Sequence, residues 1–304
     1  WAVVKSNAYG HGLVLFSSLF AKLGVDGFCV DSVIEGLKLR ENGIKRPILV
    51  LGPTLSPNSL ADAFKHKITL TMSNFEALEK LARSRLRPEF HLKIDTGMHR
   101  QGFYPEDLKK VVRLIANYRL PITGIYTHFA SATDLNSRTF TDSQFTAFKK
   151  AVRILESAGF RNILKHAANT GGTLLSQDYH LDAVRIGIGL YGLYPSGELE
   201  MQLGRKIRLK PVLSWHSVVS EIKNIEKGGY IGYDLTERVS KPTKIAVIPI
   251  GYWHGFDRGL SSIGEILIRG HRARILGRVS MDLIVADIGR VKCRVGDKAV
   301  ILGK

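Results

Sequence analysis

The first two thirds of the chain alternate short apolar runs with helix-like stretches, and this alternation limits the possible folds. Eight runs have strand character: residues 2–5, 27–31, 47–51, 68–71, 90–95, 122–129, 163–167 and 183–187. Short, apolar strands are typical of a parallel sheet that helices cover. Eight successive strand–helix units favour an α/β fold of the (β/α)8 TIM-like barrel type over an open doubly wound sheet.

The stretches between these runs carry helix signals. Residues 141–158 place apolar side chains on one helical face, namely Phe145, Phe148, Val152 and Leu155. Three pairs have the spacing of a capping box, in which a hydroxyl residue begins a helix and a Glu or Gln follows three positions later. They are Ser32 with Glu35, Ser73 with Glu76, and Thr141 with Gln144. The sequence therefore predicts helices that begin at these residues.

The pattern changes after about residue 204. Strand-like runs separated by glycines follow, without a convincing helix. We predict two domains, a barrel over residues 1–204 and a mostly β C-terminal domain over residues 205–304. Residue 1 already lies in a strand-like run, and the last residues directly follow another one. We therefore expect the barrel to be truncated at its N-terminus and the β domain at its C-terminus.

Composition argues against several classes of protein. The chain has 44 Lys and Arg against 27 Asp and Glu. These basic residues are scattered, without zinc-finger spacing or a basic heptad region, so we expect no nucleic-acid partner and attribute part of the excess to anionic small ligands. We expect no membrane association, because no apolar run approaches the ~20 residues of a span. Two distant cysteines, Cys29 and Cys293, suit a reducing cytoplasm. His11, His254 and His271 lack metal-ligand spacing, so no metal site is predicted.

A lysine ends the first predicted strand. Barrels place their catalytic groups at the C-terminal ends of strands, and Lys5 occupies such an end. A lysine held there can lose its proton and form an imine with an aldehyde, although a lysine that snorkels to the surface is the alternative. Thr170 and the glycines around Gly187 follow the last two predicted strands, where barrels often bind phosphate. Tyr9 adds a hydroxyl. A reactive lysine beside a phosphate site points to pyridoxal 5′-phosphate.

Eight segments, in order from residue 2 to residue 282, strengthen this interpretation. They read AVVKSNAYGHG, KIDTGMHRQGF, THFASATD, HAANT, VRIGIGLYGL, IGY, IPIGY and GRVSMD. Together they resemble the motifs of alanine racemases. The resemblance implies a pyridoxal-phosphate-dependent isomerase with a barrel followed by a β domain. Such an enzyme interconverts L-alanine and D-alanine with two bases and supplies D-alanine for peptidoglycan. It also implies a cytoplasmic homodimer whose subunits share each active site.

The resemblance further implies a role for individual residues. Lys5 and Tyr233 are the two catalytic bases, and the partner subunit donates the tyrosine. The expected cofactor-binding residues are Lys5, Tyr9, His128, Thr170, Arg185, Gly187 and Ile188. The expected substrate-binding residues are Arg100, Met281 and Tyr252, and Lys93 occupies a position that is often carbamylated.

Each role has a simpler structural alternative. Tyr233 can be a turn residue, His128 a structural histidine and Met281 a core residue. Arg185 and Lys93 can be ordinary ion-pair partners. Asp234 replaces a usual glycine next to Tyr233, and its charge opposes ionisation of that tyrosine. At the level of the whole chain, the alternatives are an amino-acid racemase of broader scope and a barrel protein that binds pyridoxal phosphate without catalysis. Tyr233 and the β domain argue against the second.

Overall fold

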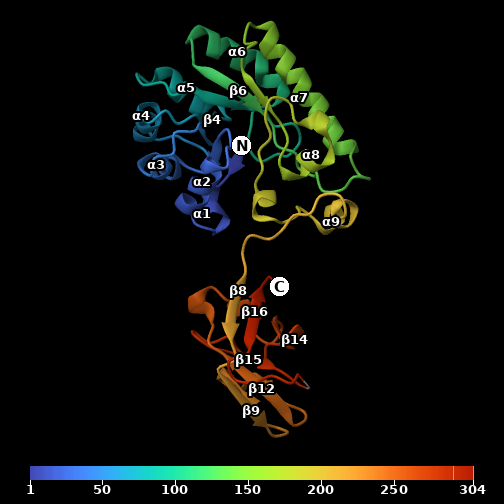
Figure 1. The fold of residues 1–304 in the computed structure, drawn as a ribbon. Coiled ribbons are helices and arrows are strands. Elements are labelled where there is room, and N and C mark those ends of the chain that lie inside the picture. Colours follow the sequence, from blue (N-terminus) through green and yellow to red (C-terminus); the bar gives the residue numbers. More distant parts are fainter. Residues whose placement is uncertain (290, 304) are drawn as a thin grey trace. The chain divides into compact units, whose positions relative to one another are not determined.

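The protein folds into two compact units, Trp1–Lys210 and Pro211–Lys304, in a computed structural model that describes residues 1–289 and 291–303. The first unit is an α/β barrel and the second is mostly β (Figure 1). Both features of the predicted fold class are confirmed.

Parallel strands form the wall of the barrel. They are β1 (Ala2–Val3), β2 (Phe28–Val30), β3 (Ile48–Val50), β4 (Leu70–Met72), β5 (Phe90–Lys93), β6 (Ile122–Tyr126) and β7 (Leu164–His166). Strands β1–β3 form one sheet and β4–β7 form another. Every residue of β2, β3, β4 and β5 is buried. This burial explains why β2 and β3 read as continuous apolar runs rather than as alternating patterns.

Single parallel bridges close these sheets into a ring. One bridge joins Leu49 to Thr69, between β3 and β4. Two more join residues 183–186 to the strands on either side, β7 and β1. Ala183 pairs with His166 of β7, and Ile186 pairs with Ala2 of β1. The eighth predicted strand therefore occupies its expected place, but it makes only isolated bridges. Arg185 lies between the two bridged residues and bonds to Ala168 through its backbone N–H, outside a regular ladder.

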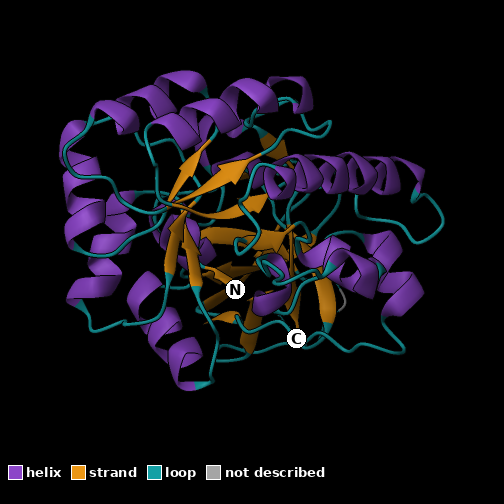
Figure 2. Cartoon of the chain, turned by 90° about the horizontal axis from the view of Figure 1, so that it is seen from above, coloured by secondary structure: helices purple, strands orange, loops and turns teal. Residues whose placement is uncertain are grey.

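Helices lie outside the strands of the first unit (Figures 1 and 2). They are α1 (Lys5–Tyr9), α2 (Leu13–Lys22), α3 (Val33–Glu41), α4 (Pro57–Lys65), α5 (Phe75–Arg83), α6 (Leu108–Asn117), α7 (Thr139–Ser157), α8 (Thr170–Leu175) and α9 (Gly197–Leu203). Short 3₁₀ turns add η1 (Pro105–Asp107), η2 (Gln177–Tyr179) and η3 (Ile188–Tyr191). Helix α7 buries Phe145, Phe148, Val152 and Leu155, as its periodicity predicts.

The predicted helix starts are correct in one case and wrong in two. Ser32 caps α3, because its hydroxyl accepts a hydrogen bond from the Glu35 N–H. Helix α5 is capped by Asn74 instead of Ser73, since the Asn74 amide oxygen accepts from the Ala77 N–H.

The third predicted start, Thr141, lies inside α7, which begins at Thr139. The Thr141 hydroxyl donates to the Ser131 carbonyl, and the Gln144 amide oxygen accepts from the Ala130 N–H. Both side chains therefore form hydrogen bonds with the loop after β6. These bonds use the groups that would otherwise form a capping box.

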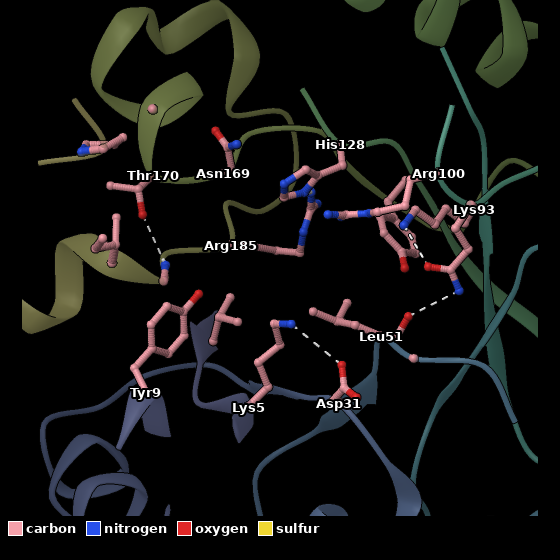
Figure 3. A pocket seen from close by; sticks show the side chains of 18 of the residues that line it. Lys5, Tyr9, Asp31, Leu51, Lys93, Arg100, His128, Asn169, Thr170 and Arg185 are labelled. Atoms are coloured by element: carbon pink, nitrogen blue, oxygen red, sulfur yellow. Dashed lines mark hydrogen bonds and ion pairs between the residues drawn. The ribbon is translucent and has the colours of Figure 1, made fainter. Parts of the chain in front are cut away.

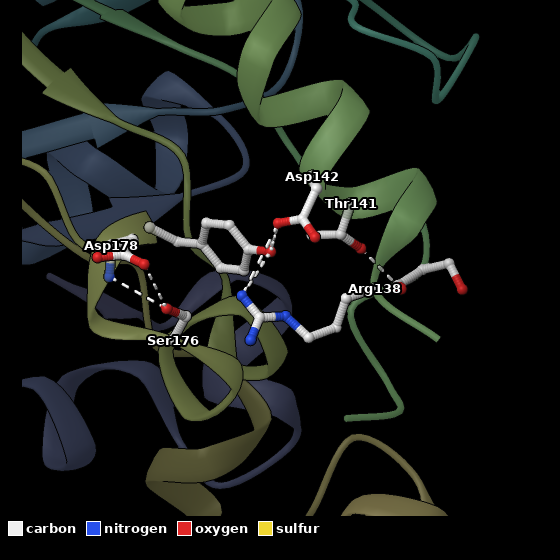
Figure 4. Close-up of polar contacts among 7 residues, drawn as sticks. Arg138, Thr141, Asp142, Ser176 and Asp178 are labelled. Carbon is white, nitrogen blue, oxygen red and sulfur yellow. Dashed lines mark hydrogen bonds and ion pairs between the residues drawn. The ribbon is translucent and has the colours of Figure 1, made fainter. Parts of the chain in front are cut away.

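A polar cluster holds the start of α7 to the chain after α8 (Figure 4). The Tyr179 hydroxyl donates to the Asp142 carboxylate, and Arg138 donates to the Tyr179 oxygen at 3.3 Å. Arg138 also pairs with Asp142 at 3.8 Å. Nearby, the Ser176 hydroxyl donates to Asp178 at 3.2 Å. The contacts among Arg138, Asp142 and Tyr179 fix the end of the long loop between β6 and α7.

The second unit consists of antiparallel strands. They are β8 (Trp215–Val218), β9 (Glu221–Ile225), β10 (Tyr230–Ile231), β11 (Glu237–Arg238), β12 (Thr243–Ile248), β13 (Glu265–Ile268), β14 (His271–Arg274), β15 (Ile284–Asp287) and β16 (Lys298–Leu302). Short 3₁₀ turns are η4 (Tyr233–Leu235), η5 (Tyr252–His254) and η6 (Arg258–Leu260). The sheet orders are β15-β12-β9 and β14-β13-β16-β8, and β10 pairs with β11.

Each unit has its own apolar core. In the second unit, Ile248, Ile266, Ile268 and Ala299 are among the fully or almost fully buried residues. Among residues 1–289 and 291–303, none of the helices has the length and apolar character that crossing a bilayer requires.

Candidate active site

A cavity of about 580 Å³ is lined by residues that follow the barrel strands. Every residue predicted for the site from the barrel domain lines it: Lys5, Tyr9, Lys93, Arg100, His128, Thr170, Arg185, Gly187 and Ile188. Tyr9 and Thr170 lie at one end of the pocket, Lys93 and Arg100 lie at the other, and Lys5 and Arg185 lie between them (Figure 3). Lining residues that were not predicted from the sequence include Asp31, Leu51, Gln101 and Asn169.

Lys5 is presented by an unusual turn. Although α1 has helical hydrogen bonding, Ser6, Asn7, Ala8 and Tyr9 all have φ near +55° (54° to 56°), which makes it left-handed. This conformation costs non-glycine residues roughly 1–2 kcal/mol each, so surrounding contacts must hold it. The Asn7 side chain accepts from the Leu13 N–H at 2.9 Å, and Ala8 is completely buried. The turn directs both Lys5 and Tyr9 toward the pocket (Figure 3).

Tyr9, Thr170 and Gly187 form a small polar cradle. The Thr170 hydroxyl accepts hydrogen bonds from the N–H groups of Gly187 at 3.1 Å and Gly189 at 3.4 Å. A Cβ atom at Gly187 would lie 2.6 Å from the Tyr9 hydroxyl oxygen, so only glycine leaves this space open. Burial raises the pKa of Tyr9, which keeps its hydroxyl protonated as a hydrogen-bond donor. Hydroxyl donors beside an open space of this kind suit a phosphate group.

Arg185 is buried in the pocket wall and is held from several sides. Its guanidinium donates to the carbonyls of Thr127 at 2.7 Å and Ala167 at 3.0 Å. It also donates to His166 Nδ1 at 2.6 Å and lies 3.4 Å from His128 Nδ1. No acidic partner of Arg185 occurs in the part of the chain that the structure describes.

The contact between Arg185 and His166 fixes the protonation of a second histidine. An arginine only donates, so His166 Nδ1 must be the acceptor, and its proton is on Nε2. That nitrogen lies 2.8 Å from His91 Nδ1, which therefore also accepts. Burial and the charge of Arg185 lower the pKa of His91 to about 3, and they lower that of His166 well below its usual value. A neutral, directional chain of histidines thus supports Arg185 from behind.

His128 is neutral for the same reason. Burial, together with the charges of Arg185, Lys93 and other cations, lowers its pKa to about 3. It therefore adds no positive charge to a pocket that Lys5, Lys93, Arg100 and Arg185 already line.

The opposite end of the pocket is shaped by the loop after β5. The Asp95 carboxylate accepts hydrogen bonds from the backbone N–H groups of residues 97–100 at 2.9–3.1 Å. Burial alone would raise its pKa, but these bonds outweigh burial, and the pKa is lowered. Asp95 thereby fixes the backbone that carries Arg100. The Lys93 ammonium donates to the Gln101 side chain at 2.9 Å, and burial with Arg100 and Arg185 lowers its pKa to about 8.

The remaining predicted residues lie on the second unit. Tyr233, Tyr252 and Met281 are all exposed, with Met281 51% exposed rather than buried in a core. Their segments come together locally, because the Trp253 N–H donates to the Met281 carbonyl at 3.0 Å and the Tyr252 N–H donates to Ser280. Asp234 forms an ion pair with Arg278 at 2.8 Å. The negative charge next to Tyr233 is therefore paired with a cation.

The barrel pocket fits a phosphorylated aldehyde. It offers a lysine for covalent attachment, a cradle with space for phosphate and a buried arginine. These three features agree with pyridoxal phosphate in the chemistry of their donors.

Comparison with known proteins places the chain in a class. Residues 1–195 match the family described as alanine racemase, N-terminal domain, and residues 212–304 match alanine racemase, C-terminal domain. The barrel and β units therefore define an amino-acid isomerase of the two-domain racemase class. Within that class, the chain belongs to the alanine racemase family.

Individual relatives agree with this assignment. An alanine racemase of Leptospira interrogans is 36% identical over 309 residues, which cover 100% of this chain and 79% of the relative. One from Carboxydothermus hydrogenoformans is 39% identical and covers 99% of this chain and 82% of its own length. A crystal structure of the Bacillus anthracis alanine racemase with bound L-Ala-P is 35% identical, with a TM-score of 0.89 over 100% of this chain and 78% of that chain. The Bartonella henselae enzyme, with covalently bound pyridoxal phosphate, is 27% identical, with a TM-score of 0.87 over 100% of this chain and 83% of that chain.

Proposed function

We propose that this protein interconverts L-alanine and D-alanine with pyridoxal phosphate and so supplies D-alanine for peptidoglycan. The observation that carries the proposal is the position of Lys5 in one pocket with the cradle of Tyr9, Thr170 and Gly187. The family of the chain and the bound ligands of its structural relatives support the same activity. We further propose that it works in the cytoplasm.

The barrel residues would hold the cofactor as follows. Lys5 would bind it covalently, the cradle residues and Ile188 would bind its phosphate, and His128 would pack beside it. When bound, the cofactor supplies a sink for the electron pair left at Cα after a proton is removed. Arg185 would face its pyridine nitrogen. Because an arginine keeps its charge and only donates, this residue cannot take a proton from that nitrogen or return it as a carboxylic acid does.

Substrate binding and proton transfer need further groups. Arg100 would orient the substrate and the cofactor oxygen, and Asp95 fixes the backbone that carries it. Inversion at Cα requires one proton donor on each face, and we assign Lys5 to one face and Tyr233 to the other. A tyrosine has an ordinary pKa of about 10, so it needs nearby positive charge to act as a base. Met281 would contact the substrate carboxylate through its backbone N–H, and Tyr252 would line the entrance.

Lys93 is proposed to carry a carbamate. Its pKa of about 8 leaves a useful fraction of neutral amine near pH 7, and a neutral amine adds CO₂ with release of one proton. The resulting anion would neutralise part of the positive charge around Arg100.

The active form is proposed to be a homodimer with a shared site. Tyr233, Tyr252 and Met281 lie on a unit separate from Lys5 and are exposed to solvent. A two-fold dimer would allow the second unit of each subunit to complete the barrel pocket of the other.

A covalent-trapping experiment tests the proposal. The protein is mixed with pyridoxal phosphate, reduced with borohydride and digested, and the modified peptide is identified by mass spectrometry. We expect one modified residue, Lys5, together with interconversion of the alanine isomers by the unreduced protein. In Lys5→Ala, the modification and the activity should both disappear while the far-ultraviolet circular dichroism is retained. A cofactor adduct at another lysine, or its persistence in Lys5→Ala, would refute the assignment.

A further inference from the structure

One acidic side chain lies in a pocket that is otherwise built for anions. Among the lining residues, all of which lie in the described part of the chain, the charged ones are the cations Lys5, Lys93, Arg100 and Arg185 and the single carboxylate Asp31. A carboxylate here weakens the attraction of the pocket for phosphate and for an amino-acid carboxylate. Its presence therefore calls for a specific role.

The partner of Asp31 is Lys5. Its carboxylate oxygen lies 3.6 Å from the Lys5 nitrogen, and the two side chains point toward each other in Figure 3. Four cations in one cavity repel one another, and the charges of Arg100, Arg185 and Lys5 all help to lower the pKa of Lys93. A single acid beside Lys5 reduces this repulsion where the ammonium would otherwise face only like charges.

Hydrogen bonds to its backbone hold Asp31 in position. Glu35, in the first turn of α3, accepts from the Asp31 N–H at 2.8 Å and from the Asn7 N–H at 3.2 Å. One carboxylate thus joins the turn that carries Lys5 to the segment that carries Asp31. On the other side, the Asp31 carbonyl accepts from the Gly52 N–H at 3.0 Å, and a Cβ at Gly52 would lie 2.3 Å from that carbonyl oxygen. Asp31 is therefore fixed opposite Lys5 by two neighbouring loops.

We propose that Asp31 is the counter-ion of Lys5, that it pairs with the ammonium whenever the lysine is not bonded to the cofactor, and that Glu35 positions the pair. This inference rests on the proposed function, because it assigns Lys5 as the residue that captures the cofactor. Capture requires the ammonium to release its proton to solvent. The amine nitrogen then bonds to the aldehyde carbon, and the aldehyde oxygen leaves as water. Asp31 opposes the first of these events.

The test follows the rate at which cofactor-free protein captures pyridoxal phosphate, by stopped-flow absorbance. In Asp31→Asn, we expect capture at neutral pH to be roughly two- to fivefold faster, which corresponds to the usual strength of an exposed ion pair. In alkaline solution, where lysines are neutral in both proteins, the acceleration should vanish. Other groups that face Lys5, including Tyr9, Lys93 and His128, are unchanged in the variant, so their titration affects both proteins equally.

Matched controls separate this role from others. Glu41→Gln removes one negative charge from the exposed end of the same helix α3 and should leave the rate unchanged. Glu35→Gln should misplace both loops and alter the acceleration that Asp31→Asn produces. Slower capture in Asp31→Asn at every pH would indicate a structural role and overturn the proposal, as would an unchanged rate. Acceleration that persists in alkaline solution would indicate attraction of the cofactor anion instead, which also overturns it.

Covalent trapping, together with the capture rate, distinguishes failure of the proposed function from failure of this inference. If Lys5→Ala still forms a borohydride-stable adduct, the assignment of Lys5 is wrong and the role of Asp31 falls with it. If Lys5 alone captures the cofactor and Asp31→Asn behaves as the wild type, only the counter-ion proposal is refuted.

Discussion

At the scale of single residues, the proposed phosphate cradle depends on the absence of one side chain. We predict that Gly187→Ala weakens binding of pyridoxal phosphate about tenfold or more. The new Cβ would lie 2.6 Å from the Tyr9 hydroxyl oxygen, and Tyr9 packs on Tyr191 with ring centroids 4.7 Å apart. The hydroxyl must therefore move, and one hydrogen bond to a charged group contributes roughly 1.5–3 kcal/mol. Equilibrium titration of the cofactor, followed by absorbance, measures the change in Kd.

A second glycine provides the control for this experiment. A Cβ at Gly197, at the start of α9, would meet no atom within 4 Å. Gly197→Ala should therefore leave cofactor binding unchanged. Equal Kd values for Gly187→Ala and the wild type would exclude Tyr9 from the phosphate site.

Lys93 should make folding stability depend on pH. Burial, Arg100 and Arg185 lower its pKa from 10.5 to about 8, although Asp95 opposes this. Between these two values the unfolded chain binds more protons than the folded protein, so the free energy of unfolding rises with pH across that window. Below pH 8, the folded state carries the full cost of a buried ammonium.

The prediction is tested by comparing the wild type with Lys93→Met. The variant should be more stable relative to the wild type at pH 8 than at pH 10, with the difference shrinking by about 1.4 kcal/mol per pH unit. Urea unfolding in cofactor-free, CO₂-depleted buffer measures it, because carbamylation would change the charge. A difference that stays constant from pH 8 to pH 10 would contradict the lowered pKa.

Several residues of the site could be predicted from the sequence because chemistry and position agree locally. Lys5 follows an apolar run, and Gly187 lies among closely spaced glycines, so each carries its own signal. Asp31 does not, since its role arises only when two neighbouring barrel loops approach each other. The left-handed turn after Lys5 was equally hidden, because residues such as Ser6 and Ala8 disfavour positive φ and adopt it only under tertiary contacts.

At the scale of elements, the glycine of β6 leaves space for a histidine side chain of β5. A Cβ at Gly124 of β6 would lie 2.5–2.6 Å from atoms of the buried His91 ring of β5. We predict that Gly124→Ala lowers the free energy of unfolding by about 1–3 kcal/mol, as overpacking of a core does. It should also disturb the support that His91 and His166 give to Arg185.

A double-mutant cycle identifies the cause. Gly124→Ala, His91→Ala and the double variant are unfolded with urea and compared. Because removal of the ring also removes the clash, the two effects should be non-additive, with the double variant less damaged than the sum predicts. Strict additivity would show that Gly124 is required for another reason.

The order of elements was easier to predict than their ends. Eight alternating strand–helix units define the ring, and they can be recognised because buried strands are mostly apolar in sequence. The helix starts at Ser73 and Thr141 were mispredicted because other groups compete for the same hydrogen bonds. Asn74 caps α5, and Thr141 binds the loop after β6. The last strand is reduced to isolated bridges, and the Arg185 backbone N–H bonds to Ala168 outside a regular ladder.

At the scale of the whole molecule, the predicted site residues fall on two units. Lys5 and its neighbours share one pocket of the barrel, whereas Tyr233, Tyr252 and Met281 lie on the β unit. The sequence motifs indicate both sets, but a linear pattern contains no information about which subunit brings them together. Subunit mixing addresses that question directly.

We predict that two inactive variants restore activity when their subunits exchange. Lys5→Ala damages the barrel half of a site, and Tyr233→Phe damages the other half. If the halves come from different subunits, each mixed dimer contains one intact site and one doubly damaged site. Random exchange at equal concentrations makes about half of the dimers mixed, so activity should approach about one quarter of the wild-type value. The measurement is the rate of alanine racemisation, with exchange verified by mass spectrometry of labelled subunits.

The control is a pair of variants damaged in the same half. Mixing Lys5→Ala with Arg185→Ala leaves every barrel pocket defective, so no activity should return. If both pairs stay inactive after exchange is demonstrated, each chain must complete its own site, and the shared-site proposal fails. If only the first pair recovers, Tyr233 must act in the pocket of the partner. That result would explain why a tyrosine needed for catalysis is exposed in the single chain, since assembly would then cover it.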